Sequence, residues 1–262
     1  MDLYEAERIH QETFPWQRAT HFVDYNGVLG HYQALSCIEH AKGPNVLDLA
    51  CGDGTITAIF SQHFERVVGV DASAKNLDVA IKRLPKVEFH QSLIEEFNTD
   101  ERFGSVLMLN ILEHVIDPVV TMTQAASFLR DDGSLVVHVP NALAINRRIA
   151  VIMGTLTHCE ELSPFDIEIA GHRRSYTMAS LKADVESAGL RITATGGVFY
   201  KMLSTAQMDW FLKNGPWDEG GFGWGRVGTP NKDWKGEFCR ACYEIGKEKP
   251  EDCNVIFVCA TR

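Results

Sequence analysis

The stretch LDLACGDG at residues 47–54 decides the fold. It begins as a short apolar run, which is typical of a buried strand, and it ends in a glycine-rich turn. Helical spacing follows directly, from Thr55 to Gln62. Glycines let the backbone turn tightly and approach a ligand closely, and the first turn of a helix offers unpaired N–H groups. The stretch therefore predicts a strand, a ligand-binding turn and a helix in succession.

Outward from this stretch, the chain alternates between strand and helix patterns. Helical patterns occupy residues 74–83 and 118–129, and each lies between two apolar runs. Such alternation predicts an α/β fold, with a parallel sheet covered by helices on both faces. With two later runs included, the sequence predicts seven strands, at residues 46–50, 67–70, 87–89, 105–109, 135–139, 190–199 and 254–260.

The composition is that of one globular domain. The chain has 262 residues, of which 45% are hydrophobic and 23% are charged. A chain of this length can bury a full core without disulfides or metal. We expect a single domain over residues 1–262, with a core at about residues 44–140. The seven cysteines do not form the even-numbered framework of a small secreted protein, so reduced thiols and a cytoplasmic location are expected.

The net charge of -10 opposes non-specific binding to nucleic acid or to anionic membranes. No apolar run reaches the ~18–20 residues of a membrane span. The N-terminus is charged from residue 2 and lacks the apolar segment of a secretory signal. We therefore expect a small-molecule partner, no nucleic acid and no membrane. The sequence does not predict the oligomeric state.

Two long segments, at about residues 141–180 and 201–250, interrupt the alternation of strands and helices. Together with the helical segment before the core, they are expected to form the substrate side. The second segment carries four of the five tryptophans, and its middle, residues 215–228, is rich in glycine. Long insertions of this kind predict a mobile lid. The alternative is that the aromatic side chains pack the segment onto the core.

Asp71 follows the second predicted strand and is the second element of the ligand site. In dinucleotide-binding folds, a carboxylate at this place accepts hydrogen bonds from a ribose diol. A dinucleotide dehydrogenase would carry a third glycine three residues after Gly54, where this chain has Thr57. Asp48 and Asp53 would also repel a pyrophosphate. Their negative charge favours a cationic nucleoside, such as S-adenosylmethionine (SAM).

At this point the sequence resembles the class I SAM-dependent methyltransferases, in their small-molecule branch. A later segment, GHRRSYTMASLKADVESAGL at residues 171–190, looks like its counterpart in one bacterial branch of that family. The resemblance implies a Rossmann-like seven-stranded, mainly parallel sheet. The matching motifs are LDLACGDG (47–54), VVGVDAS (67–73), FGSVLMLNILEHVIDP (103–118) and LRDDGSLVVHVPN (129–141).

The resemblance also implies roles for single residues. Asp71 would bind the ribose hydroxyls, Ala72 would pack on the adenine, and Asn110 would lie near the methionine part and the sulfonium. Many relatives have Asp after the third strand, where this chain has His90-Gln91-Ser92-Leu93, and Ser92 is the residue there that can hydrogen-bond. No metal ligand is implied. The implied cofactor-binding residues are Asp48, Ala50, Gly52, Gly54, Asp71, Ala72, Ser92 and Asn110.

The candidate catalytic residues are His172, Tyr176 and Asn110. In an open parallel sheet, ligands bind beyond the carboxyl ends of the strands, and the segment after the fifth strand reaches that edge. Arg173 or Arg174 could hold a substrate carboxylate there. The alternative is that both arginines are solvated and that His172 caps a helix.

Further residues of types that often carry chemistry have a structural interpretation here. His114 could act as a base, but the sequence favours Glu113 and His114 fixing their loop through hydrogen bonds. His138 is expected to be a satisfied histidine within the sheet. Cys239 and Cys242 form a single CxxC without a matched second pair, so packing is favoured over zinc binding.

The sequence therefore predicts SAM-dependent methyl transfer to a small molecule by direct displacement at the sulfonium methyl. Two alternatives remain. One resembles the azetidine-2-carboxylate synthases: the amino group of the methionine moiety attacks its own side chain and releases 5′-methylthioadenosine, with Asn110, Asn141 and Tyr176 gripping that amino group. The other is a non-catalytic SAM-binding protein.

Overall fold

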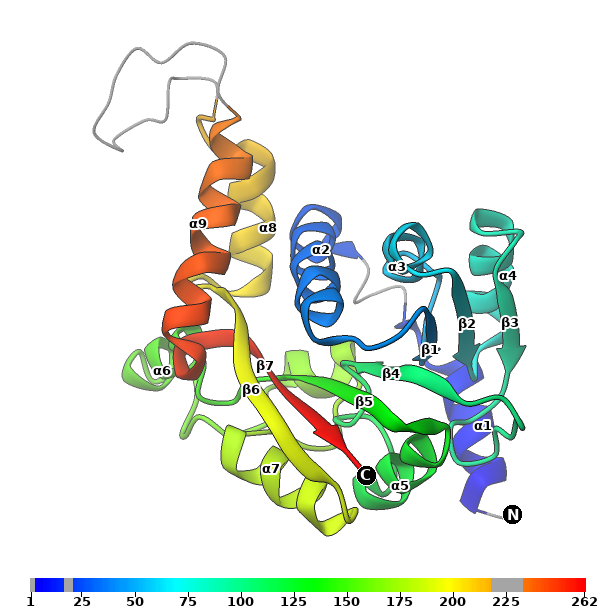
Figure 1. Cartoon of the computed structure of the whole chain (residues 1–262). Coiled ribbons are helices and arrows are strands. Elements are labelled where there is room, and N and C mark those ends of the chain that lie inside the picture. The colour runs from blue at the N-terminus through cyan, green and yellow to red at the C-terminus, as the bar shows by residue number, and fades with distance from the viewer. Residues whose placement is uncertain (1–2, 17–20, 218–232) are drawn as a thin grey trace.

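A computed structural model describes residues 3–16, 21–217 and 233–262. Its centre is a seven-stranded sheet in the order β3-β2-β1-β4-β5-β7-β6 (Figure 1). The first five strands along the chain run parallel to one another, and β7 is antiparallel to both of its neighbours. The strands are β1 (Asn45–Leu49), β2 (Arg66–Asp71), β3 (Glu88–Gln91), β4 (Phe103–Leu109), β5 (Leu129–Pro140), β6 (Arg191–Tyr200) and β7 (Cys253–Thr261).

The mainly parallel, Rossmann-like sheet predicted from the sequence is thereby confirmed, and helices cover both of its faces. Side chains cap several helices, among them α4 (Ala74–Arg83) and α5 (Pro118–Ser127). The Ser73 hydroxyl accepts the Asn76 N–H at the start of α4, and Asp117 caps α5. The helices are α1 (Leu3–Thr13), α2 (Val23–His40), α3 (Thr57–His63), α4 (Ala74–Arg83), α5 (Pro118–Ser127), α6 (Ile145–Ile152), η2 (Phe165–Ala170), α7 (Met178–Ser187), α8 (Thr205–Asn214), α9 (Trp234–Glu248) and η3 (Pro250–Asp252).

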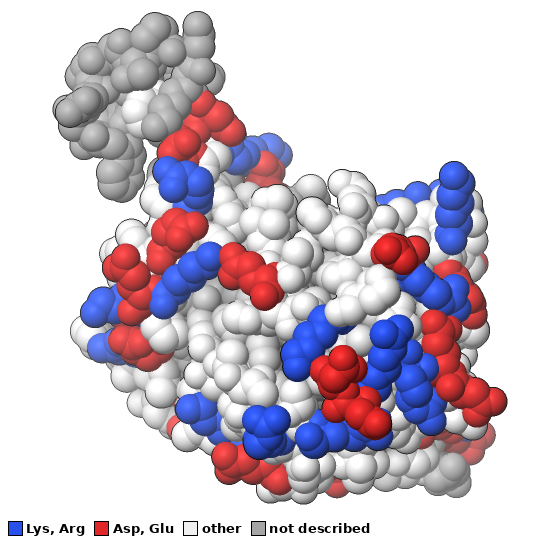
Figure 2. Space-filling view, in the orientation of Figure 1, with Lys and Arg blue, Asp and Glu red and all other residues white. Residues whose placement is uncertain are grey.

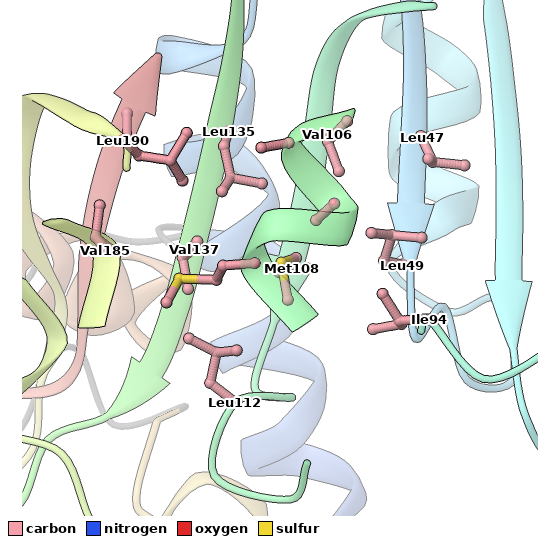
Figure 3. Packing of buried hydrophobic residues seen from close by; sticks show 14 of the residues in the cluster. Leu47, Leu49, Ile94, Val106, Met108, Leu112, Leu135, Val137, Val185 and Leu190 are labelled. Atoms are coloured by element: carbon pink, nitrogen blue, oxygen red, sulfur yellow. The ribbon is translucent and has the colours of Figure 1, made fainter. Parts of the chain in front are cut away.

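One face of the sheet packs against α5 and α7 (Figure 3). Alternate residues of β1, β4 and β5 meet apolar side chains of these two helices. Val185 on α7 and Leu190 after it lie against β5 in this cluster. Burial of such side chains contributes roughly 1.5–3 kcal/mol each to folding, so this layer holds the strand ends in place.

The other face packs against α2, α3, α8 and α9. Tyr32 of α2 stacks on Tyr243 of α9 with ring centroids 4.6 Å apart. Cys239 and Cys242 lie in the same apolar cluster on α9, as the packing interpretation of the CxxC predicted. All seven cysteines, which fall within the described ranges, are free thiols.

The predicted lid falls largely outside the described residues. Its first residues, Gly215–Trp217, are described, and Trp217 packs against Phe211 with ring centroids 4.9 Å apart. Trp210, by contrast, is 64% exposed. The contact of Trp217 therefore fits the alternative in which the aromatic side chains pack this segment onto the rest of the protein.

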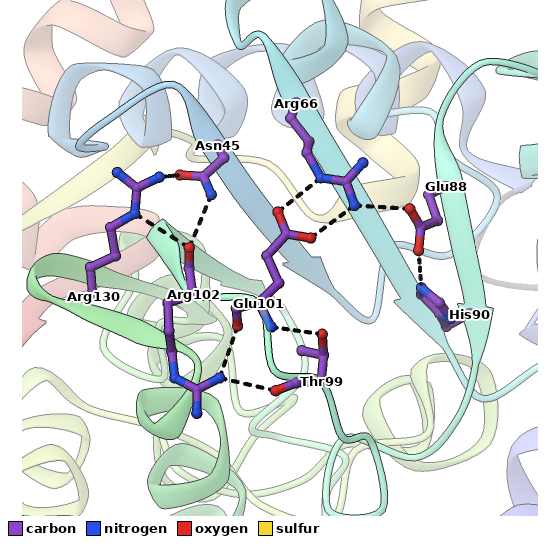
Figure 4. A network of polar contacts seen from close by, with 8 residues as sticks. All are labelled: Asn45, Arg66, Glu88, His90, Thr99, Glu101, Arg102 and Arg130. Atoms are coloured by element: carbon purple, nitrogen blue, oxygen red, sulfur yellow. Dashed lines mark hydrogen bonds and ion pairs between the residues drawn. The ribbon is translucent and has the colours of Figure 1, made fainter.

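A polar network ties together the amino ends of the strands (Figure 4). Arg66, the first residue of β2, donates to Glu101 before β4 and to Glu88 on β3. Asn45, the first residue of β1, donates to the Arg102 carbonyl at 3.0 Å. These contacts lie at the edge opposite the carboxyl ends of the strands, and exposed ion pairs of this kind contribute little to stability.

On the face shown in Figure 2, Lys and Arg side chains are interspersed with Asp and Glu. This mixture suits a solvated surface more than a track for phosphates. Within the described ranges, no helix has both the length and the apolar character needed to cross a membrane.

Candidate active site

A cavity of about 670 Å³ opens at the carboxyl ends of β1, β2 and β4. Ala50 follows β1, Asp71 ends β2 and Asn110 follows β4, and all three line the cavity. Parallel strands end at one edge of a sheet, so residues far apart in the chain meet there. Six of the eight predicted cofactor-binding residues line this one cavity, namely Ala50, Gly52, Asp71, Ala72, Ser92 and Asn110.

Asp71 holds the glycine-rich turn as well as facing the cavity. One carboxylate oxygen accepts the Gly52 N–H at 2.9 Å, and the other accepts the Ser73 N–H at 2.9 Å and an Asn76 amide N–H at 3.4 Å. Burial raises the pKa of Asp71, and the hydrogen bonds oppose this shift. A carboxylate offers about four lone-pair sites, so acceptor capacity remains for a ligand hydroxyl.

The two glycines of the turn serve different needs. Gly52 lines the cavity at φ 56°, and a Cβ placed there would point into open space. Gly54, at φ 75°, does not line the cavity, and its Cβ would lie 3.1 Å from the Ala80 Cβ. The structure therefore places Gly52 against the ligand space and Gly54 against α4.

Ala50 and Asn110 have left-handed backbone conformations, with φ of 61° and 52°. Such a conformation costs about 1–3 kcal/mol for a residue with a side chain, although Asn tolerates it better than Ala. Both residues sit at strand ends on the cavity wall. Strain of this kind gathers at binding sites, where the surrounding structure enforces it.

Asp48 was predicted to bind the cofactor, itself or through the adjacent backbone, and the structure places its side chain away from the cavity. Its side chain is buried and accepts the Thr57 hydroxyl at 2.7 Å, beneath the first turn of α3. It does not line the cavity. Burial raises the pKa of Asp48 to about 7. Asp48 therefore affects the cavity indirectly, through the first turn of α3 that it supports.

Ala72 and Ser92 lie on the wall that continues past β2 and β3. The Ser92 N–H donates to the Asp71 carbonyl at 3.0 Å, and the Ser92 hydroxyl donates to the Leu93 carbonyl. This wall stands where the resemblance implies the adenine.

The opposite wall comes from the N-terminal segment. Tyr4, Gln11 and Trp16, from α1 and the residues after it, line the cavity together with Asn26 of α2. The indole N–H of Trp16 donates to the Gln11 carbonyl at 2.9 Å. The sequence predicted this segment on the substrate side, but it did not identify the residues that line the cavity.

The two insertions do not line this cavity in the described part of the chain, contrary to expectation. Tyr176 is 2% exposed, and its hydroxyl donates to Asp184 at 2.9 Å. The structure thus does not bring Tyr176 to Asn110. Its backbone carbonyl accepts the Ala142 N–H, which ties the first insertion to the end of β5.

Both candidate arginines have partners within the protein. Arg173 pairs with Glu7 of α1 at 2.6 Å. Arg174 donates to the carbonyls of Leu112 and Ile116 at 2.7 and 2.9 Å, and so clamps the loop after β4. Neither lines the large cavity, so the predicted grip on a substrate carboxylate lacks a geometric basis there.

His172 lines a second cavity of about 30 Å³, together with Glu113. The ring of His172 lies 5.1 Å from that of His114, which lines the large cavity. Nδ1 of His114 donates to the Gly171 carbonyl at 3.1 Å. Burial lowers the pKa of His114 to about 3 and raises the pKa of Glu113 to about 8. The prediction that hydrogen bonds fix this loop fits His114. It does not fit the Glu113 side chain, whose carboxyl oxygens have no hydrogen-bond partner among the described residues.

The site geometry agrees with comparisons to known proteins. A family model described as a methyltransferase domain matches residues 15–195, which include every wall of the cavity except its α1 part. This chain belongs to the class I SAM-dependent methyltransferase family. The resemblance stated from the motifs is therefore confirmed.

Curated relatives of this chain include ubiquinone biosynthesis O-methyltransferases. The protein from Rhodopseudomonas palustris (strain TIE-1) is 31% identical over 109 residues, which cover 40% of this chain and 42% of the relative. That from Coxiella burnetii (strain RSA 331 / Henzerling II) is 28% identical over 170 residues, covering 62% and 70%. The chain spans about two fifths of the length of the first relatives that it matches.

Solved structures share the fold at low identity. A SAM-dependent methyltransferase from Clostridium acetobutylicum ATCC 824 is 13% identical over 98% of both chains, with a TM-score of 0.54. Magnesium protoporphyrin IX methyltransferase from Synechocystis PCC 6803, with bound SAH, is 17% identical with a TM-score of 0.56, covering 77% of this chain and 95% of that one. At such identities the likeness concerns the fold alone.

The described residues fit the cofactor of the family. Open space lies where Gly52 would carry a side chain, and Asp71 presents a carboxylate beside it. Both belong to the wall on which the motifs converge. A cationic nucleoside therefore meets negative charge and room at the same place.

Proposed function

We propose that this methyltransferase transfers the SAM methyl group to a small molecule held in the same cavity. The observation that carries the proposal is the composition of that cavity: the SAM-motif residues form one wall and the N-terminal segment forms the other. Its volume of about 670 Å³ falls within the range of about 300–1,000 Å³ found for small-molecule sites. The cavity thus offers space beyond the cofactor motifs for an acceptor.

The roles of the residues are to bind, orient and exclude water. Asp71 would hold the ribose hydroxyls, the turn at Gly52 would receive the backbone side of the cofactor, and Asn110 would lie near its methionine part. Bound SAM supplies a methyl group already activated by the sulfonium. The protein then contributes proximity and alignment, which lower the barrier without covalent participation.

We infer a hydroxyl group as the methyl acceptor. The support is the function of the curated relatives, which are O-methyltransferases. The acceptor side of the cavity combines apolar surface, such as Trp16 and Val23, with the polar groups of Gln11 and Asn26. An apolar molecule that carries a hydroxyl suits these walls.

The cyclisation alternative requires Asn110, Asn141 and Tyr176 to surround the amino group together. The Asn141 amide donates to the carbonyls of Glu251 and Cys253, and the Tyr176 hydroxyl donates to Asp184. Neither side chain lines the large cavity beside Asn110. Methyl transfer is therefore the function that the geometry supports best.

The purified protein incubated with SAM, alone and with a panel of phenols and catechols, tests this proposal. We expect S-adenosylhomocysteine only when an acceptor is added, together with a product heavier by one methyl group in mass spectrometry. Accumulation of 5′-methylthioadenosine from SAM alone, above a control without enzyme, would support cyclisation instead. SAM binding without turnover on any acceptor of the panel would count against the hydroxyl assignment.

A further inference from the structure

Glu113, His114 and His172 form a cluster of potential metal ligands behind the acceptor side of the cavity. One donor atom from each lies within 4.8 Å of the others. Glu113 and His114 come from the loop after β4, and His172 follows η2. Nothing in the spacing of these residues along the chain shows that the two loops meet.

The side chain of Glu113 is buried without a hydrogen-bond partner among the described residues. The residue is 1% exposed, and neither carboxyl oxygen has a hydrogen-bond partner among the described residues. Arg174, the nearby cation, donates from both terminal nitrogens to backbone carbonyls of the same loop. A buried carboxyl group without a partner is costly to ionise, and a bound cation offsets that cost.

His114 is oriented as metal-binding histidines are, and His172 lies near a carboxylate without a hydrogen bond from its ring to it. Nδ1 of His114 donates to the Gly171 carbonyl, which leaves Nε2 as a lone pair 3.7 Å from Glu113 Oε1. Nδ1 of His172 lies 3.8 Å from Asp166 Oδ1. A carbonyl or carboxylate behind the second ring nitrogen fixes the tautomer and raises ligand basicity in metal sites.

We propose that Glu113, His114 and His172 bind a divalent transition-metal ion with the ligand preference of zinc. Two imidazoles and one carboxylate form the donor set of zinc sites that keep an open coordination position. Zinc bonds of about 2.0–2.2 Å require donors closer together than those of the metal-free cluster, so binding would draw the three side chains together.

The position of the cluster suggests what the ion does. His114 lines the large cavity, whereas Glu113 and His172 line the small one, so the cluster forms part of the wall between them. This role rests on the proposed function: the ion would hold an acceptor hydroxyl and lower its pKa, and the proton would leave to bulk water. The resulting oxyanion is the better methyl acceptor.

Metal titration of the full chain tests the site without relying on turnover. The protein is stripped with a chelator, desalted and titrated with Co²⁺, which has visible absorption bands, and with Zn²⁺ by calorimetry. We expect one ion per chain, displacement of Co²⁺ by Zn²⁺ and no competition from Mg²⁺, which prefers oxygen ligands. Glu113→Gln and His172→Ala should weaken binding by more than tenfold.

Matched controls come from the same insertion. Glu160 and His158 are exposed, so Glu160→Gln and His158→Ala should bind the ion as the original chain does. S-adenosylhomocysteine affinity, measured in every variant, reports correct folding and an intact cofactor site. If the chain binds no stoichiometric Co²⁺ or Zn²⁺, or if the cluster variants bind as tightly as the controls, the metal site is wrong while the proposed methyl transfer stands.

Discussion

The side-chain amides of Gln33 and Asn110 hydrogen-bond each other reciprocally. Nε2 of Gln33 lies 3.1 Å from Oδ1 of Asn110, and Nδ2 of Asn110 lies 3.2 Å from Oε1 of Gln33. Gln33 is buried on α2, and Asn110 follows β4 in a left-handed conformation. The pair thus joins the N-terminal layer to the strand end at which the sulfonium is expected.

Gln33→Met should remove both hydrogen bonds to Asn110 while roughly conserving side-chain volume. The variant leaves the Asn110 amide without its partner, which costs about 1–3 kcal/mol when the group is buried. We expect a lower free energy of unfolding and SAM affinity weakened by roughly fivefold, equivalent to about 1 kcal/mol. Denaturant unfolding and calorimetry measure the two effects. Gln62→Met, at an exposed position of α3, is the control, and equal effects in both variants would remove Gln33 from the site.

Asp71→Asn tests the ribose contact. The amide keeps one oxygen for the turn but loses the negative charge, and hydrogen bonds to charged groups contribute about 1.5–3 kcal/mol. We expect the affinity for SAM and for S-adenosylhomocysteine to fall by about tenfold to a hundredfold. Calorimetry provides the measurement. Asp78→Asn, on the exposed side of α4, should leave affinity unchanged, and an unchanged affinity in Asp71→Asn would refute the assigned role.

The buried Asp48 predicts a pH dependence of stability. Burial raises its folded-state pKa from 3.8 to about 7, so the folded protein holds this proton more tightly than the unfolded chain does. The contribution to stability is complete below pH 3.8 and is lost as the pH rises to about 7. Between these values this single group lowers stability by at most about 1.4 kcal/mol per pH unit.

Asp48→Asn removes that titration and keeps an oxygen to accept the Thr57 hydroxyl. We expect stability to fall less steeply between pH 5 and pH 7 than in the original chain, so that the variant gains relative stability as the pH rises. Urea unfolding at intervals of one pH unit measures the difference. Asp100→Asn, at an exposed position, should follow the original curve. Parallel curves for Asp48→Asn would show that the carboxyl is ionised throughout.

The acidic chain should not retain nucleic acid. Its net charge is -10, and its paired arginines are partly used internally, as in Arg147 with Asp166 at 3.0 Å. Binding to phosphates requires a basic face that releases counterions. We expect no complex with tRNA or duplex DNA in a gel-shift assay at physiological salt. A micromolar complex that weakens as salt is added would revive an RNA substrate.

Local motifs predicted the cofactor wall because strand ends converge at one edge of a parallel sheet. LDLACGDG at residues 47–54 and Asp71 carry that information in consecutive elements. Asn110 could be placed for the same reason. The direction of the Asp48 side chain could not, because a strand buried on both faces has no polar alternation to reveal it.

Contacts between distant loops were beyond the reach of the sequence. Glu113 and His172 meet only because the first insertion folds back beneath the loop after β4, where the Arg173 N–H donates to the Glu113 carbonyl. No periodicity encodes such a return. The packing of the N-terminal segment against the cavity is similar, since its aromatic residues indicate burial but not which surface they cover.

Tyr176 separates a catalytic interpretation from a structural one. Its ring lies in the apolar core, and its hydroxyl donates to Asp184 of α7 at 2.9 Å. Tyr176→Phe removes only that hydrogen bond, and hydrogen bonds to charged groups contribute about 1.5–3 kcal/mol. We expect a lower free energy of unfolding with SAM affinity and methyl transfer essentially unchanged at temperatures where the variant is folded.

Thermal unfolding and initial rates, measured together with Asp184→Asn, check this, because loss of the same contact should give similar destabilisation from either side. A loss of activity above tenfold in Tyr176→Phe, with stability intact, would restore the catalytic role predicted from the sequence.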